Sequence, residues 1–262
     1  MKKLIWVIVV VVILVLGVVG YGFYGGFKTK NFATNSEKTF NASQTKWKVS
    51  DLANPPADTE SDTTKLKAHF QKILDDCNSA TSTINNLGKT SKGKTAKTNL
   101  IRYYALGKKS SENALVFVDY MAEMQKIEKD LSFNPTGTTP DSLAKDLQTF
   151  KTTVDADLST LKSIKTTPST KILNDAFIKV LTDLSGYIGP AITAVNSGDI
   201  NAMASMSTNM GKTMSTFEQT KLPTETEMQN DIITKSEQDE MNSLASKIPS
   251  ELTGLKKTIF AY

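Results

Sequence analysis

The chain has 262 residues, of which 39% are hydrophobic and 22% charged, and its formal net charge is +4. Lys2 and Lys3 precede an apolar N-terminal segment, so the rest of the chain is close to neutral. Basic residues alternate with acidic ones and Arg102 is the only arginine, which disfavours nucleic acid as a partner. One cysteine, Cys77, excludes an intramolecular disulfide, and one histidine, His69, excludes metal and catalytic sites that need two.

The first expected element is an uncharged apolar run at residues 4–27, which follows a short N-terminus at residues 1–3. The run exceeds the roughly 20 residues that a helix needs to cross a bilayer, so we expect a single-pass transmembrane helix that acts as a signal anchor. A cleaved signal peptide is the alternative, although the run is longer than the usual apolar core of such peptides. The lysines in the N-terminal flank favour a cytoplasmic N-terminus, which places the bulk of the chain outside the cytoplasm.

Residues 28–62 are polar and end in Asn54-Pro55-Pro56-Ala57-Asp58, a sequence that disfavours helix. We expect this segment to be a stalk or linker. Phe32, Phe40 and Trp47 are scattered through it and could dock part of the stalk onto the following domain.

From residue 63 to residue 262, apolar residues recur at spacings of three and four, which is the period of an amphipathic helix. Gly88 and the Gly198-Asp199 pair interrupt the pattern, and Pro140 and Pro168 fit the first turns of new helices. No series of period-two runs indicates strands. The sequence therefore predicts an all-α protein, in which a single transmembrane helix precedes an antiparallel bundle of about five or six helices. Cys77 lies on one of the apolar stripes, where we expect a small buried side chain.

The segment Gly88-Lys89-Thr90-Ser91-Lys92-Gly93-Lys94-Thr95 matches the pattern G-x-x-x-x-G-K-[ST]. Together with an apolar stretch that ends in Asp119, it resembles the motif pair of the P-loop NTPases, over these two short segments only. The resemblance implies that Gly88 and Gly93 let the backbone wrap phosphates, Lys94 neutralises them, Thr95 holds Mg²⁺ and Asp119 supports the metal. The context favours another interpretation, a lysine-rich turn after a helix, because the residues before Gly88 follow a helical stripe and not a buried strand.

Four methionines, Met203, Met206, Met210 and Met214, share one face of an expected helix. Thioethers are soft ligands that suit Cu(I), so a metal site is one interpretation. Because no histidine or cysteine lies nearby in the sequence, packing in a helical core is the favoured one. A flexible surface that binds peptides is the third.

In organisation the chain resembles bacterial single-pass proteins that display a helical bundle outside the cell, among them the sensing bundles of chemoreceptors. That resemblance is one of architecture and carries no function. Since no convincing set of catalytic groups emerges, we expect a membrane-anchored, non-enzymatic envelope protein without a cofactor. Its partners would be the lipid bilayer, through residues 4–27, and a protein, a wall component or a small ligand. A P-loop nucleotide hydrolase and a methionine-based Cu(I) module are the alternatives.

Overall fold

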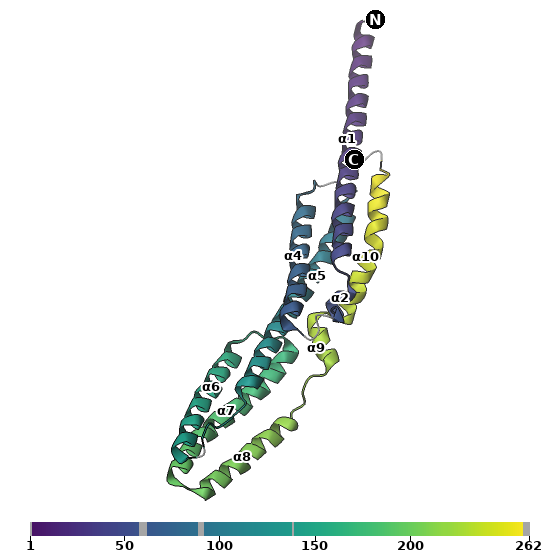
Figure 1. Cartoon of the computed structure of the whole chain (residues 1–262). Coiled ribbons are helices and arrows are strands. Elements are labelled where there is room, and N and C mark those ends of the chain that lie inside the picture. Colours follow the sequence, from purple (N-terminus) through teal and green to yellow (C-terminus); the bar gives the residue numbers. More distant parts are fainter. Residues whose placement is uncertain (1, 58–61, 89–91, 138, 259–262) are drawn as a thin grey trace. The chain divides into compact units, whose positions relative to one another are not determined.

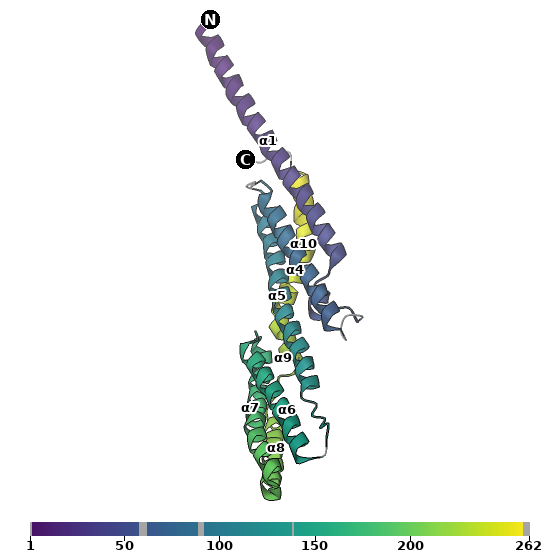
Figure 2. The ribbon, with the colours of Figure 1, turned by 60° about the vertical axis from the view of Figure 1, so that its left-hand side comes forward.

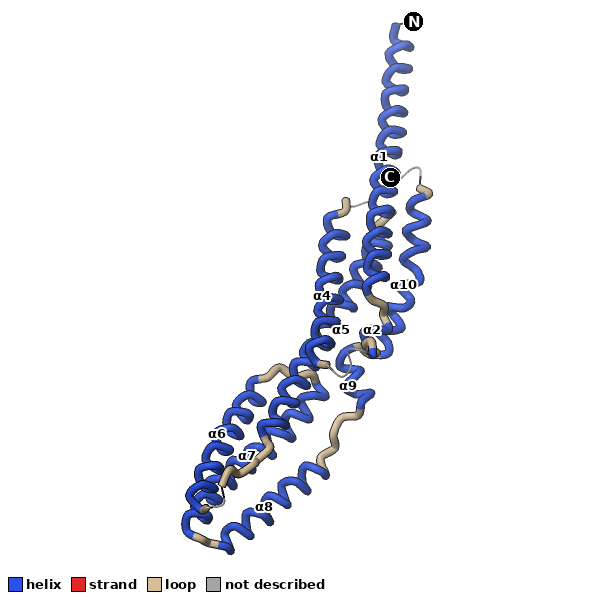
Figure 3. The backbone as a smooth tube through the Cα atoms, viewed as in Figure 1, coloured by secondary structure: helices blue, strands red, loops and turns tan. Residues whose placement is uncertain are grey.

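The computed structural model describes residues 2–57, 62–88, 92–137 and 139–258, without the side chains of residues 2–23 and of positions 200, 203, 206, 207 and 214. Within these ranges the chain forms nine helices and no strand, which confirms the all-α class (Figures 1 and 3). The predicted helical-bundle architecture fits, and the helices divide into two compact units. One unit is made of Met1–Glu60, Ala68–Glu112 and Ile233–Tyr262 and the other of Ser61–Lys67 and Asn113–Ile232.

The first unit is built from antiparallel helices around the long α1. Its elements are α1 (Lys2–Lys46), α2 (Ser50–Ala53), most of α4 (Thr63–Asn86), the first half of α5 (Lys94–Asp130) and α10 (Lys235–Lys256). α10 lies along the second half of α1 in both views (Figures 1 and 2), and Lys256 Nζ reaches Glu37 Oε2 at 2.5 Å.

The structure differs from the sequence prediction over residues 28–62, which we expected to form a polar stalk. α1 continues as a helix through Lys46, and one face of it is buried in the first unit. The buried positions recur every three or four residues, but serine and threonine alternate with the aromatic residues, so the stripe looks polar in the sequence. The break before the proline pair is confirmed, since α2 ends at Ala53. The stripe consists of Thr29, Phe32, Ser36, Phe40, Ser43 and, just after α1, Trp47, and Gly26 and Ala33 beside it are also buried.

A buried carboxylate holds the end of α1 against α4. Asp76, which is 7% exposed, accepts hydrogen bonds from Lys46 Nζ at 2.5 Å and from Trp47 Nε1 at 3.0 Å. Burial by itself raises the pKa of this carboxyl, but the hydrogen bonds from Lys46, Ser43 and Trp47 outweigh it and hold the pKa below its ordinary value. The neighbouring Cys77 is fully buried, as expected, and burial raises the pKa of its thiol to about 12, so it is an inert packing residue.

The second unit contains the rest of α5 and helices α6 (Pro140–Ser163), α7 (Pro168–Ser197), α8 (Ile200–Glu218) and α9 (Glu225–Ile232). Local capping chemistry sets where these helices begin. Thr139 and Thr167 form capping boxes immediately before Pro140 and Pro168, which confirms the two predicted helix starts. Gly198, at φ +64°, ends α7, and the Asp199 side chain accepts from the Ala202 N–H to begin α8, also as predicted.

Among the described residues, no helix combines the length and the hydropathy that a membrane crossing requires. The predicted anchor spans residues 4–27, and the side chains of most of these residues lie outside the described part of the structure.

Candidate ligand pocket in the second unit

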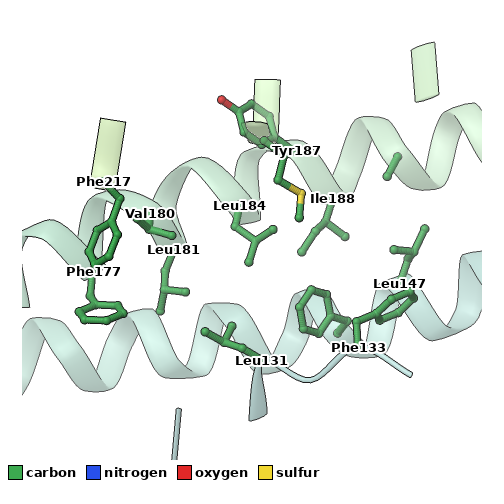
Figure 4. Close-up of a pocket in the computed structure, with 13 residues that line it drawn as sticks. Leu131, Phe133, Leu147, Phe177, Val180, Leu181, Leu184, Tyr187, Ile188 and Phe217 are labelled. Carbon is green, nitrogen blue, oxygen red and sulfur yellow. The ribbon is translucent and has the colours of Figure 1, made fainter. Parts of the chain in front are cut away.

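An apolar pocket of about 420 Å³ lies in the second unit, bordered by α6, α7, α8 and the chain that follows α5 (Figure 4). We call it the α7 pocket, because α7 supplies most of its wall. Its volume falls within the range of about 300–1,000 Å³ that is usual for small-molecule sites. No lining side chain is charged. The lining residues are Leu131, Phe133, Leu147, Phe150, Phe177, Val180, Leu181, Leu184, Tyr187, Ile188, Ala191, Met210 and Phe217.

The rim of the pocket reaches the surface. Phe133 is 36% exposed and Met210 is 44% exposed, whereas Leu181 and Ile188 on the inner wall are almost completely buried. Aromatic pairs stand at two places along the wall, Phe133 with Phe150 at 5.2 Å between ring centroids and Phe177 with Phe217 at 5.1 Å. A molecule can therefore enter from the side of α8 and the loop after α5.

Polar contacts clamp two of the walls together outside the pocket. Ser185 Oγ of α7 donates to Asp155 Oδ1 of α6 at 2.5 Å, and Lys151 Nζ of α6 donates to Ser185 Oγ at 3.3 Å and, within its own helix, to Asp155 Oδ2 at 2.7 Å. These bonds from Lys151 and Ser185 hold the pKa of Asp155 below its ordinary value. Near the connection between the helices, Asn174 Nδ2 donates to the Leu161 carbonyl at 2.8 Å. α6 and α7 thus form a fixed wall.

Tyr187 is the one lining residue with an oxygen or nitrogen atom in its side chain, and this hydroxyl already has a hydrogen-bond partner outside the pocket. Its hydroxyl lies 3.2 Å from Thr213 Oγ1 of α8, and Thr213 in turn donates to Asp183 Oδ2 at 3.2 Å. Figure 4 shows the hydroxyl pointing away from the other lining side chains. The pocket therefore offers apolar contact and aromatic faces, but no hydrogen bond that would select a polar ligand.

A second groove of about 410 Å³ adjoins the α7 pocket and shares Leu131 and Phe177 with it. It runs along α5 and includes polar side chains, Gln125 and Glu128. It is also lined by Tyr120, whose buried hydroxyl has no hydrogen-bond partner among the described residues. Burial raises the pKa of Tyr120 to about 12, so the group is a neutral phenol at physiological pH.

The residues that resemble a phosphate loop lie between two helices. Gly88 follows the end of α4, and Lys94 and Thr95 are exposed in the first turn of α5. Gly93 is buried just before them, and its carbonyl accepts from the Lys97 N–H. Lys89, Thr90 and Ser91 lie outside the described residues. The strand that precedes a true phosphate loop is replaced here by α4.

Asp119, the expected metal-supporting residue of that motif pair, has a different partner. It belongs to the second unit, where its carboxylate accepts from Lys67 Nζ at 2.7 Å. Close to the same segment, Lys97 Nζ donates to the carbonyls of Asn85 and Leu87 at 3.1 and 3.2 Å and so caps the end of α4. Of this segment, Gly88 therefore lies just after α4, Gly93 lies in a turn just before α5, and Lys94 and Thr95 begin α5.

The methionine stripe lies on α8. The side chain of Met210 lines the α7 pocket, and those of Met203, Met206 and Met214 lie outside the described residues. In the part of the chain that the structure describes, no three His, Cys, Asp or Glu side chains gather closely enough to hold a metal ion.

The three-and-four spacing that predicts the helices marks most of the wall of the pocket but misses Phe133, Leu181 and Ile188. The wall residues that it marks include Leu147, Phe150, Phe177, Val180, Leu184, Tyr187 and Phe217. A signal for Leu181 and Ile188 exists in the sequence. Phe177, Leu181, Leu184, Ile188 and Ala191 follow a three-and-four spacing beside the predicted stripe, so the apolar face of α7 is wider than a single neighbouring helix would cover.

No protein-family model matches the chain, and comparison with curated proteins and with solved structures finds no similar chain.

Proposed function

We propose that the protein is a membrane-anchored, non-enzymatic envelope protein whose α7 pocket binds an uncharged apolar molecule, of the size and character of a single alkyl chain. The observation that carries the proposal is the pocket itself, which combines a volume of about 420 Å³ with a lining of aliphatic, aromatic and thioether side chains.

The chemistry of the lining favours an apolar occupant over water or a polar metabolite. An apolar cavity gives water no hydrogen-bond partners, so such cavities stay dry and take up apolar molecules. Each methylene group that leaves water for such a site contributes about 0.8 kcal/mol. Because the Tyr187 hydroxyl is engaged with Thr213, a polar head group gains nothing inside the pocket.

The membrane part of the proposal rests on the uncharged run at residues 4–27 and the lysines before it. An anchored protein has a bilayer beside it, and a bilayer is a reservoir of alkyl chains. The location outside the cytoplasm follows from the same flanking lysines. The proposed partners are therefore the bilayer and an apolar ligand drawn from the envelope.

Photolabelling of the full-length chain in membranes tests the proposal. The probe is a hexadecanol that carries a diazirine in its chain, and cross-linked peptides are mapped by mass spectrometry. We expect label at two places, in the anchor at residues 4–27 and in the pocket peptides of α7 and α8. Leu184→Trp fills the pocket with a larger side chain and should reduce the pocket label about tenfold while the anchor label persists.

The matched control is Ile172→Trp, which adds the same side chain to α7 at a position that is 47% exposed and does not line the pocket. This variant should label like the unmodified chain. Pocket label that is equal in all three chains, or missing from all three, would contradict ligand binding, and unlabelled residues 4–27 would contradict the anchor.

A further inference from the structure

Three segments that are far apart in the sequence meet at one end of the first unit, where the ends of α4 and α10 lie beside residues 35–39 of α1. Lys256, at the end of α10, pairs with Glu37 of α1. Leu87, just after α4, lines a shallow groove together with Asn35 and Thr39 of α1. Figures 1 and 2 both show the ends of α4 and α10 beside this stretch of α1.

The segments at this end of the unit are rich in lysine, and the acidic residues that border them, Glu37 and Glu251, are held by Lys256 and Asn99. Residues 24–36, 87–98 and 252–258 all include lysines, and none of them includes an aspartate or glutamate. Four lysines of these segments have exposed side chains, and we call them together the lysine face. They are Lys28, Lys30, Lys94 and Lys257. The face gathers charge of one sign in a chain whose charges are otherwise mixed.

α1 leaves no spacer between the apolar run and the folded unit. The run ends at residue 27, and Gly26, Thr29, Phe32 and Ala33 are already buried. At a rise of 1.5 Å per residue, Lys30 follows the end of the run by only about 5 Å along the helix axis. If residues 4–27 occupy the bilayer, Lys28 and Lys30 therefore lie at the level of the lipid headgroups, and Lys94 and Lys257 follow them on the side of the folded unit.

Exposed aromatic side chains lie at the same point along α1, at the end of the apolar run. Tyr24 and Phe27 are 57% and 62% exposed, although most large apolar side chains of the first unit are buried. Lys28 Nζ lies 4.4 Å from the centre of the Tyr24 ring. Aromatic rings combined with lysines are typical of the boundary between hydrocarbon and headgroups.

We propose that the lysine face binds the anionic phosphate headgroups of the bilayer and thereby holds the first unit against the membrane surface. The inference rests on the membrane anchor of the proposed function and adds a lipid specificity to it. It also assigns a role to Lys94, which the P-loop resemblance singled out: its ammonium group would meet lipid phosphate as a point charge, among other lysines, without a loop that encloses a nucleotide. Binding of this kind weakens as salt screens the charges.

Hydrogen exchange of the full-length chain in lipid nanodiscs tests the inference. One set of discs contains only phosphatidylcholine, and the other also contains 30% phosphatidylglycerol. We expect the amides of peptides that cover residues 92–98 and 252–258 to exchange at least threefold more slowly in the anionic discs. The difference should disappear in 0.5 M NaCl.

Two variants of equal net charge separate the lysine face from charge in general. Lys30→Glu, Lys94→Glu and Lys257→Glu together should abolish the difference between the discs. The control combines Lys48→Glu, Lys72→Glu and Lys235→Glu, which are exposed lysines away from this end of the unit, and it should retain the difference.

The outcomes distinguish this inference from the anchor on which it depends. A chain that does not enter either kind of disc would overturn the anchor and the lysine face together. A chain that enters both but exchanges equally in them would overturn the lysine face alone, and so would an equal loss of protection in both triple variants.

Discussion

Gly107 lets α5 approach the core of the first unit more closely than any residue with a side chain could. A Cβ atom at this position would lie 2.9 Å from Cys77 Sγ and 3.1 Å from the Trp47 ring. Optimal contacts between such atoms are about 3.5–4.0 Å. Both neighbours are buried, with Cys77 0% and Trp47 2% exposed, so neither can move aside without disturbing a packed core. We predict that Gly107→Ala destabilises the first unit.

The magnitude follows from two opposed effects. Replacing glycine by alanine inside a helix gains about 1 kcal/mol in helix propensity. Forcing an extra methyl group into a filled core costs about 1–3 kcal/mol. Gly254→Ala in α10 of the same unit is the control, since a Cβ there meets nothing within 4 Å. The free energy of unfolding of Gly107→Ala should therefore lie about 1–3 kcal/mol below that of Gly254→Ala.

Urea unfolding followed by tryptophan fluorescence measures this difference. A Trp6→Phe background leaves Trp47, which is buried in the first unit, as the only reporter. Adding Cys77→Ala removes the sulfur that the new methyl group would meet, so the double variant should be more stable than the sum of the two single changes predicts. Additive effects in this cycle, or a Gly107→Ala variant as stable as the control, would refute the close approach of α5.

Two further predictions concern buried polar atoms of the second unit that have no hydrogen-bond partner among the described residues. Asp157 is 3% exposed with Oδ2 unpaired, and burial, followed by the nearby Asp130, raises its pKa. Its contribution to stability is therefore greatest below the ordinary value of 3.8 and is lost as pH rises through the folded-state pKa. We expect the free energy of unfolding of Asp157→Asn, measured with urea, to exceed that of the unmodified chain by about 1 kcal/mol or more at pH 7 and by less at pH 4. A gain in stability that does not change with pH would contradict a raised pKa of Asp157. Tyr120→Phe removes a buried hydroxyl that lacks a partner, so thermal unfolding should show unchanged or higher stability, and a loss of about 1 kcal/mol would reveal a hydrogen bond instead.

The helix boundaries could be predicted from the sequence because capping chemistry is local. Pro140 and Pro168 each follow a threonine that forms a capping box, and Gly198 takes the left-handed conformation that ends α7. Residues 28–46 could not be assigned in the same way. Their buried stripe contains Ser36 and Ser43, and hydrophobicity alone does not mark small hydroxyl residues that face a core.

The division into two units and the α7 pocket were also beyond the sequence, for a different physical reason. Leu147, Phe177 and Leu184 were recognised as core-facing residues, and all three line the pocket. Periodicity shows which face of a helix avoids water, but it does not show whether neighbouring side chains fill the space between helices. A cavity is space that the neighbouring side chains leave unfilled, so its presence depends on the three-dimensional positions of all of its walls.

The α7 pocket should take up one apolar molecule per chain. Native mass spectrometry of the full-length chain with added hexadecanol measures this directly, because it counts bound molecules. We predict one bound hexadecanol on the unmodified chain and on Ile172→Trp, and none on Leu184→Trp, in which a larger side chain occupies the pocket. The same number of bound molecules on all three chains would contradict the claim.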